Sequence, residues 1–191
     1  MTLELNEVLL SGEKYPLTLL AGEGSLTCIS GGTASLRTRL LYVLMGFEAP
    51  VSGYVSIDGE PLHDGGSIAH LRHHIAFAPA SLDTVGIIMP YEPPSTADVL
   101  SLRSYRRLTI TEADVEEEMR RTGATGQKAR LLAIAALRKT PVLLVDSPHI
   151  DTAAYLCHLA REEGRTVIVA TDDDGIARQA DGIVMLGLHE Q

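Results

Sequence analysis

Apolar positions recur along this chain with two different periods, which divide it into strands and helices. The segments Leu3–Leu10 and Leu17–Ser30 are rich in apolar residues and predict strands, with a turn at residues 22–24 that splits the second. From Leu36 to Met45 the apolar residues follow helical spacing, and Gly46 is placed to end that helix. The chain therefore opens with strands that lead into one helix.

The next part of the sequence predicts a hairpin and a short strand. Residues 50–53 (PVSG) indicate a turn, Tyr54–Ile57 a strand, and Asp58-Gly59 a hairpin-type turn. Ile75–Ala78 predicts a strand that ends at Pro79.

The second half alternates between helical and strand patterns. The proline-rich stretch Met89–Thr96 indicates a subdomain boundary. Helices are predicted at Ala97–Tyr105, Thr111–Arg121, Gly126–Leu137 and Ala153–Glu163, and strands at Pro141–Asp146, Thr166–Ala170 and Gly182–Leu186. Strands that alternate with helices imply an α/β fold, with a largely parallel sheet and helices on its faces.

Composition narrows the function classes. The 191 residues fit one domain, and the net charge of −9 argues against a nucleic-acid binder, because such proteins need a basic face. The two cysteines, Cys28 and Cys157, have no metal or disulfide spacing. Neither a signal-peptide pattern nor an apolar run of membrane-spanning length is present, so we expect a cytoplasmic protein without direct membrane insertion.

The candidate chemistry begins at Ile29–Leu41 (ISGGTASLRTRLL), between a predicted strand and a predicted helix. A phosphate-binding P-loop reads G-x-x-x-x-G-K-[ST] at such a place. Gly31, Leu36, Arg37 and Thr38 occupy its Gly, Gly, Lys and Ser/Thr positions. Leu36 adds a side chain where the backbone should approach a phosphate closely, and Arg37 replaces a compact ammonium with a planar fork.

The order of segments resembles the ATPase domain of ABC (ATP-binding cassette) proteins almost from end to end. The most specific stretch is Leu40–Leu62, which is similar to the family's helix, glycine, proline, Ser-Gly turn and Asp-Gly hairpin after the P-loop. Further similarity lies in Ile75–Pro79, Gly123–Leu137, Thr140–Pro148 and Gly164–Asp173.

This resemblance implies a P-loop NTPase-type α/β fold. We expect a mainly parallel sheet flanked by helices, with an N-terminal antiparallel β subdomain and a shortened helical subdomain. Residues 1–191 would form one domain, with its core at 1–90 and 138–191 and the reduced helical subdomain at about 91–137.

The resemblance also assigns nucleotide and metal positions for ATP and Mg²⁺. Thr38 and Asp146 are the implied magnesium ligands, and Gly126 and Gln127 remain from the family's signature. The implied nucleotide-binding residues are Gly31, Gly32, Thr33, Ala34, Ser35, Leu36, Arg37, Thr38 and Arg39.

Most catalytic positions depart from the family pattern, so no catalytic residue is assigned. Ser147 stands where a Glu would polarise the attacking water, and a neutral hydroxyl is a poor general base near pH 7. Asp172 stands in place of a histidine and would repel a γ-phosphate. Ala80 replaces a glutamine, and Gly123–Gln127 (GATGQ) loses the signature's serine and one glycine.

Several residues have two interpretations. Arg37 is either a phosphate ligand or a solvated arginine, and Asp146 either a metal ligand or a capping carboxylate. For Asp172–Asp174 a solvated turn or helix cap is favoured over a metal site. A surface cluster is favoured over a metal site for His70, His73 and His74.

Three further positions remain open. His149 either substitutes for a lost catalytic group or packs, with packing favoured. Asp151 is a candidate subunit-contact aspartate, and Tyr15 lies near the place of the family's adenine-stacking aromatic.

The leading functional hypothesis is a degenerate ABC-type subunit that binds ATP weakly or not at all. It would act with a membrane permease, a second ABC ATPase subunit or both, as a homodimer or heterodimer held at the inner face of the membrane. One alternative is a divergent but active Mg-ATP-hydrolysing enzyme of a transporter. Another is a nucleotide-independent protein-interaction scaffold.

Overall fold

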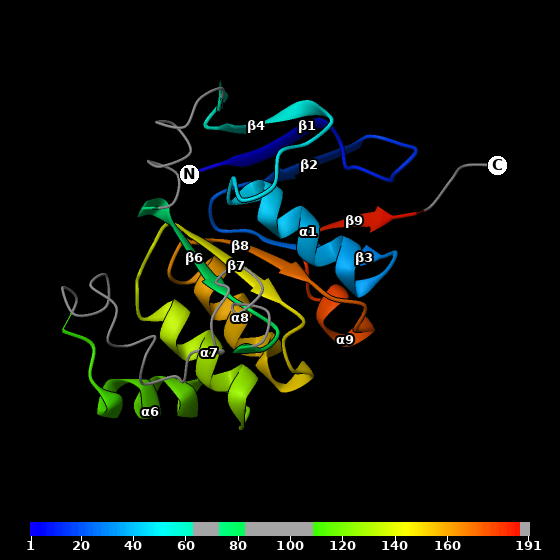
Figure 1. The fold of residues 1–191 in the computed structure, drawn as a ribbon. Coiled ribbons are helices and arrows are strands. Elements are labelled where there is room, and N and C mark those ends of the chain that lie inside the picture. Colours follow the sequence, from blue (N-terminus) through cyan, green and yellow to red (C-terminus); the bar gives the residue numbers. More distant parts are fainter. Residues whose placement is uncertain (63–72, 83–108, 188–191) are drawn as a thin grey trace.

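The N-terminal part of the protein forms an antiparallel sheet. The computed structural model describes residues 1–62, 73–82 and 109–187. The sheet has the strand order β2-β1-β4-β5 and lies at the top of Figure 1. Its strands are β1 (Leu3–Leu9), β2 (Leu17–Ala21), β4 (Ser52–Ile57) and β5 (Glu60–Pro61).

The second sheet is parallel, with the order β6-β7-β8-β3-β9. Every residue of two of its strands, β7 and β8, is buried. Their continuous apolar sequences, VLLVD and TVIVA, are typical of a sheet that is covered on both faces. Its strands are β3 (Leu26–Gly31), β6 (Ile75–Ala78), β7 (Val142–Asp146), β8 (Thr166–Ala170) and β9 (Gly182–Leu186).

Helices cover both faces of the parallel sheet. Helix α1 (Ala34–Leu44) lies between the two sheets (Figure 1), and one apolar cluster joins its leucines to residues of β1, β2, β7 and β8. A second cluster joins α7 (Gln127–Ala136) and α8 (Ala153–Arg161) to the opposite face. The remaining helical elements are α6 (Glu112–Arg121), the 3₁₀ turn η1 (Ile150–Thr152) and α9 (Asp174–Ala177).

The predicted fold class is confirmed, and so are most of the predicted elements that fall on described residues. Thr111 caps α6 in a capping box with Asp114, and Gly46 follows α1 at φ +69°. Asp58 and Gly59 both have positive φ, as the predicted hairpin turn requires.

Two predicted boundaries are wrong. Helix α1 starts at Ala34 instead of Leu36, because the side chain of Thr33 caps it two residues earlier than the apolar pattern begins. Ser52 and Gly53 belong to strand β4 and not to a turn, since β4 pairs with β1 at an irregular register there. A Cβ on Gly53 would lie 2.3 Å from the carbonyl oxygen of Glu7, so only glycine fits.

Some of the predictions made from the sequence concern residues that the structure does not describe. His70, Met89–Thr96 and Ala97–Tyr105 lie outside the described residues, and the division into core and helical subdomain stays a prediction. Within the described ranges, no helix is long and apolar enough to cross a membrane.

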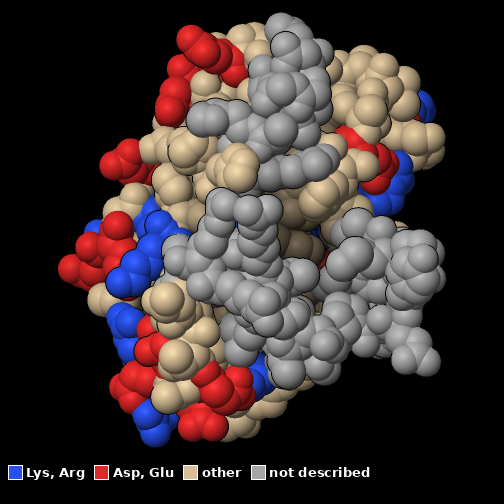
Figure 2. Space-filling view, turned by 60° about the vertical axis from the view of Figure 1, so that its left-hand side comes forward, with Lys and Arg blue, Asp and Glu red and all other residues tan. Residues whose placement is uncertain are grey.

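Charged side chains on α6 and α7 pair with one another. Arg130 contacts Glu112, Arg120 contacts Glu117, and Arg121 lies 2.8 Å from a carboxylate oxygen of Glu118. The face in Figure 2 accordingly carries acidic and basic residues side by side toward its lower left.

Candidate functional site

The candidate site is assembled at the carboxyl ends of three strands of the parallel sheet. Strand β3 ends at Gly31 and leads into α1, β7 ends at Asp146, and β8 ends two residues before Asp172. In α/β sheets of this kind, ligands bind beyond the carboxyl ends of the strands. The fold therefore brings together residues that the sequence separates by more than a hundred positions.

Both loop glycines have positive φ, and both pack tightly against strand β9. Gly31 has φ +75°, and a Cβ there would lie 2.6 Å from the carbonyl oxygen of Leu186. Gly32 has φ +59°, and a Cβ there would lie 3.1 Å from Cδ2 of Leu36. The Leu36 side chain, 8% exposed, is thus folded over the loop's second glycine. These glycines are required by packing within the protein, whatever the loop binds.

The first turn of α1 satisfies part of its own hydrogen bonding. The Leu36 N–H donates to Oγ1 of Thr33 at 3.2 Å, and the Arg37 N–H donates to the Thr33 carbonyl at 3.1 Å. In a P-loop, N–H groups at this helix start face phosphate oxygens. Here the Thr33 side chain already accepts a hydrogen bond from one of these N–H groups, that of Leu36.

Arg37 turns back into the loop. Its NH1 donates to the carbonyl oxygens of Gly31 (2.9 Å) and Gly32 (3.5 Å), and its NH2 lies 3.2 Å from Oδ2 of Asp172. Arg37 is only 3% exposed, so the interpretation as a solvated arginine is wrong. The sequence analysis did not predict this pair, and the opposite charges of the two residues are the signal that could have suggested it.

Asp146 and Thr38 meet at the end of β7. The Thr38 hydroxyl donates to Oδ2 of Asp146 at 2.7 Å, and the Ser147 hydroxyl donates to Oδ1 at 3.0 Å. Asp146 is 3% exposed, which makes it a buried carboxylate fixed by two hydroxyls. Carboxylate and hydroxyl oxygens are hard donors of the kind that Mg²⁺ prefers, so this pair fits the implied metal.

Ser147 is fixed by hydrogen bonds from its backbone and its hydroxyl. Its backbone has φ +49°, its N–H donates to the carbonyl of Ala170 at 2.8 Å, and its hydroxyl is bound to Asp146. Its carbonyl accepts from Nζ of Lys128, on the first turn of α7, at 2.7 Å. Sequence reasoning missed this contact of Lys128, because nothing in the spacing links α7 to the end of β7.

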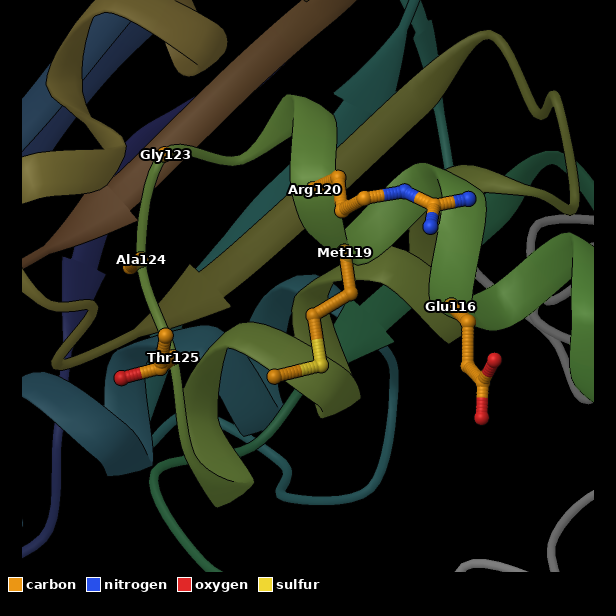
Figure 3. A pocket seen from close by; sticks show the side chains of 6 residues that line it. All are labelled: Glu116, Met119, Arg120, Gly123, Ala124 and Thr125. Atoms are coloured by element: carbon orange, nitrogen blue, oxygen red, sulfur yellow. The ribbon is translucent and has the colours of Figure 1, made fainter.

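The signature-like segment Gly123–Gln127 leads into α7. Gly126 has φ +85° and precedes the helix without a side-chain cap. A cavity of about 430 Å³ lies between this segment and α6. Figure 3 shows the Met119 side chain extending from α6 toward the segment that carries Thr125. The cavity is lined by Glu116, Met119, Arg120, Gly123, Ala124 and Thr125. The cavity thus borders the first three residues of the segment and not the start of α7.

Tyr15 lies just before strand β2 and lines a cavity near the P-loop-like segment. It is 46% exposed and lines a cavity of about 210 Å³ with Leu36 and with residues of β9. The structure therefore places this aromatic beside the P-loop-like segment.

The remaining candidates have local structural contacts. Nδ1 of His149 lies 3.3 Å from both the N–H and Oδ2 of Asp151, within η1 and its cap. Asp173 caps α9 through the N–H groups of Gly175 and Ile176, as the helix-cap interpretation predicts. His73 is exposed and His74 half-buried, just before β6, and Ala80 is half-buried just beyond it. In the part of the chain that the structure describes, no group of three or more His, Cys, Asp and Glu side chains is arranged to hold a metal.

Comparison with known proteins decides the family. The family model described as ABC transporter matches residues 16–149, more than half of the chain. The chain belongs to the ABC transporter family. The match contains the loop, α1, the signature-like segment and β7, whereas Tyr15 and Asp172 lie outside it.

Curated ABC proteins are distant relatives of this chain. It is 25% identical over 185 residues to the lipoprotein-releasing system ATP-binding protein LolD 1 of Caulobacter vibrioides, covering 84% of this chain and 78% of that protein. It is 30% identical to the Fe(3+) ions import ATP-binding protein FbpC of Yersinia pestis, covering 80% of this chain and 48% of that protein. The chain thus spans about half the length of FbpC.

Solved ABC structures share its fold. The structure of cbiO1 from Clostridium perfringens, part of the ABC transporter complex cbiONQ, has a TM-score of 0.66 and 20% identity, and covers 96% of this chain and 83% of that one. The ATP-binding cassette MJ0796, in a dimeric post-hydrolysis state bound to ADP and phosphate, has a TM-score of 0.64 at 20% identity, and covers 96% and 94%.

Proposed function

We propose that this chain is a degenerate ATP-binding subunit of an ABC-type transporter, with weak nucleotide binding and little or no hydrolysis of its own. The observation that carries the proposal is the state of Ser147. Its hydroxyl donates to Asp146 and its backbone is fixed by Ala170 and Lys128, so the residue in the family's glutamate position is a neutral hydroxyl and a poor base for activating water.

Three other features support weak binding. Leu36 packs on Gly32, Thr33 holds the Leu36 N–H, and the Arg37 guanidinium is engaged by two loop carbonyls and by Asp172. A nucleotide would have to compete with these internal contacts. Where it binds, Thr38 and Asp146 would hold Mg²⁺, which would neutralise phosphate charge, and Tyr15 would contact the base.

The proposed partners are a membrane permease and a competent ATPase subunit at the inner face of the membrane. Nucleotide sites in the family form between two subunits, and a homodimer of this chain would pair two altered sites. A heteromeric assembly in which the partner supplies hydrolysis is therefore favoured. Affinity purification of the tagged chain from detergent-solubilised membranes tests this part, with recovery of both proteins as the expected result.

Phosphate release by the purified chain tests the loss of hydrolysis. We expect turnover with Mg-ATP near the background of the assay, and an Asp146→Asn variant that does not differ from the natural chain. Turnover at a rate ordinary for an enzyme, about 1–100 s⁻¹, that Asp146→Asn abolishes would contradict the proposal.

An active but divergent ATPase is the second candidate. It is favoured by one observation, the intact Thr38–Asp146 pair, which retains the donors for magnesium. The same phosphate-release assay separates the two candidates.

A further inference from the structure

The ion pair between Arg37 and Asp172 places a carboxylate against the cation of the P-loop-like segment. Arg37 lies in the first turn of α1, after β3, and Asp172 follows β8, which pairs with β3 in the sheet. Their side chains are 3.2 Å apart, NH2 to Oδ2. The Asp172 side chain is 77% exposed, whereas that of Arg37 is almost fully buried, so the carboxylate covers the guanidinium from the solvent side.

The other guanidinium nitrogens point into the protein. NH1 is bound to the carbonyl oxygens of Gly31 and Gly32. Nε is buried and has no hydrogen-bond partner among the residues that the structure describes. An approaching anion would therefore have to compete with Asp172 for NH2.

A lysine in this position of a P-loop reaches the β- and γ-phosphates of a bound nucleotide. Arg37 has the same place in the chain, so a terminal phosphate of a bound nucleotide would compete with Asp172 for its NH2. A carboxylate at 3.2 Å from that nitrogen supplies a negative charge and accepting oxygens, as a phosphate would, although it carries one charge instead of nearly two.

We infer that Asp172 acts as an internal substitute for the terminal phosphate, so that this site selects nucleoside diphosphates over triphosphates. This inference rests on the proposed function, in which a nucleotide occupies the loop at all. A triphosphate has to displace Asp172 from Arg37 or bring its γ-phosphate against the carboxylate, and like charges a few ångströms apart repel strongly where water is partly excluded. A diphosphate has no γ-phosphate, and its β-phosphate is cradled mainly by the N–H groups of the loop, so it competes less with Asp172 for Arg37.

The test compares the dissociation constants of ADP and ATP, each with Mg²⁺, by titration calorimetry on the full chain. We expect ADP to bind about tenfold more tightly than ATP, a preference that corresponds to one ion-pair contact. Asp172→Asn removes the charge at an exposed position and should bring the two constants to within about threefold, mainly by tightening ATP binding. Asp172→Ser is a second variant with the same expectation.

Asp174→Asn is the matched control. It makes the same change of charge two residues away, on the exposed first turn of α9, and should leave the preference for ADP unchanged. Equal affinities in the natural chain, a preference for ATP, absence of ADP binding, or a preference that survives in Asp172→Asn would each overturn the inference. Phosphate release from the same ATP samples separately tests the proposed function, because rapid hydrolysis would contradict that proposal whatever the ratio of the two constants.

Discussion

The hydroxyl of Thr38 donates a hydrogen bond to the buried carboxylate of Asp146 across 108 positions of sequence, at 2.7 Å. This contact ties the first turn of α1 to the end of β7. It preserves the two groups that would hold Mg²⁺ in a part of the molecule where Ser147 and Arg37 have both departed from the ABC pattern. The same bond also has a structural consequence, because Asp146 is almost completely buried.

Thr38→Val should destabilise the protein by about 1–3 kcal/mol, since it removes a donor from a buried carboxylate. Urea unfolding at neutral pH measures the loss, and Thr38→Ser, which keeps the hydroxyl, is the control. In a double-mutant cycle with Asp146→Asn the two changes should couple by more than about 0.5 kcal/mol. Purely additive effects would mean that the hydrogen bond contributes nothing.

Gly31→Ala should cost more stability than the positive φ alone explains. Gly31 and Gly164 have nearly the same φ, +75° and +71°, but a Cβ at Gly31 meets the Leu186 carbonyl at 2.6 Å, whereas one at Gly164 has nothing within 4 Å. Gly164→Ala therefore measures the conformational cost, about 1 kcal/mol, and Gly31→Ala should exceed it by roughly 1–3 kcal/mol because β9 must shift. Similar unfolding midpoints for the two variants would contradict the packing role of Gly31.

Periodicity predicted the parallel sheet well because strands such as Val142–Asp146 are buried on both faces and read as continuous apolar runs. Boundaries set by side-chain hydrogen bonds were less accessible, as with Thr33 at the start of α1. The resemblance to the ABC family predicted which residues form the candidate site. It did not predict the contacts that these residues make with one another. That Arg37 folds inward, and that Lys128 reaches Ser147, depends on tertiary contacts that no local pattern encodes.

The buried phenol of Tyr155 should make the protein sensitive to high pH. Burial raises the pKa of Tyr155 above its ordinary value of 10.0, and its hydrogen bond to Glu118 raises it further. Below that value the phenol is protonated in both states. Above it the unfolded chain loses the proton while the folded protein keeps it, so stability falls as the pH rises past about 10.

Urea unfolding between about pH 9 and pH 11 measures this slope. Tyr155→Phe should lack the part of it that the phenol contributes, and should also be less stable near neutral pH because Glu118 loses a donor. Tyr54→Phe, at an exposed tyrosine on β4, is the control and should keep the slope of the natural chain. Parallel profiles for the natural chain and Tyr155→Phe would show that the unfolding does not depend on this proton.

Leu36→Gly restores the glycine of the P-loop pattern, yet we expect it to weaken the protein. The Leu36 side chain is 8% exposed, belongs to the apolar cluster beneath the antiparallel sheet and packs on Gly32. Its removal should cost about 3 kcal/mol, the usual loss for a large-to-small change in a core, together with the helix penalty of glycine. Leu36→Met, which conserves volume, should cost less than about 1.5 kcal/mol.

Calorimetric titration of Leu36→Gly with Mg-ADP completes this test. Leu36 is one of the contacts with which a nucleotide would compete, so Mg-ADP should bind at least about threefold more tightly to this variant than to the natural chain. A stable Leu36→Gly protein with unchanged Mg-ADP affinity would mean that the leucine does not hinder nucleotide binding.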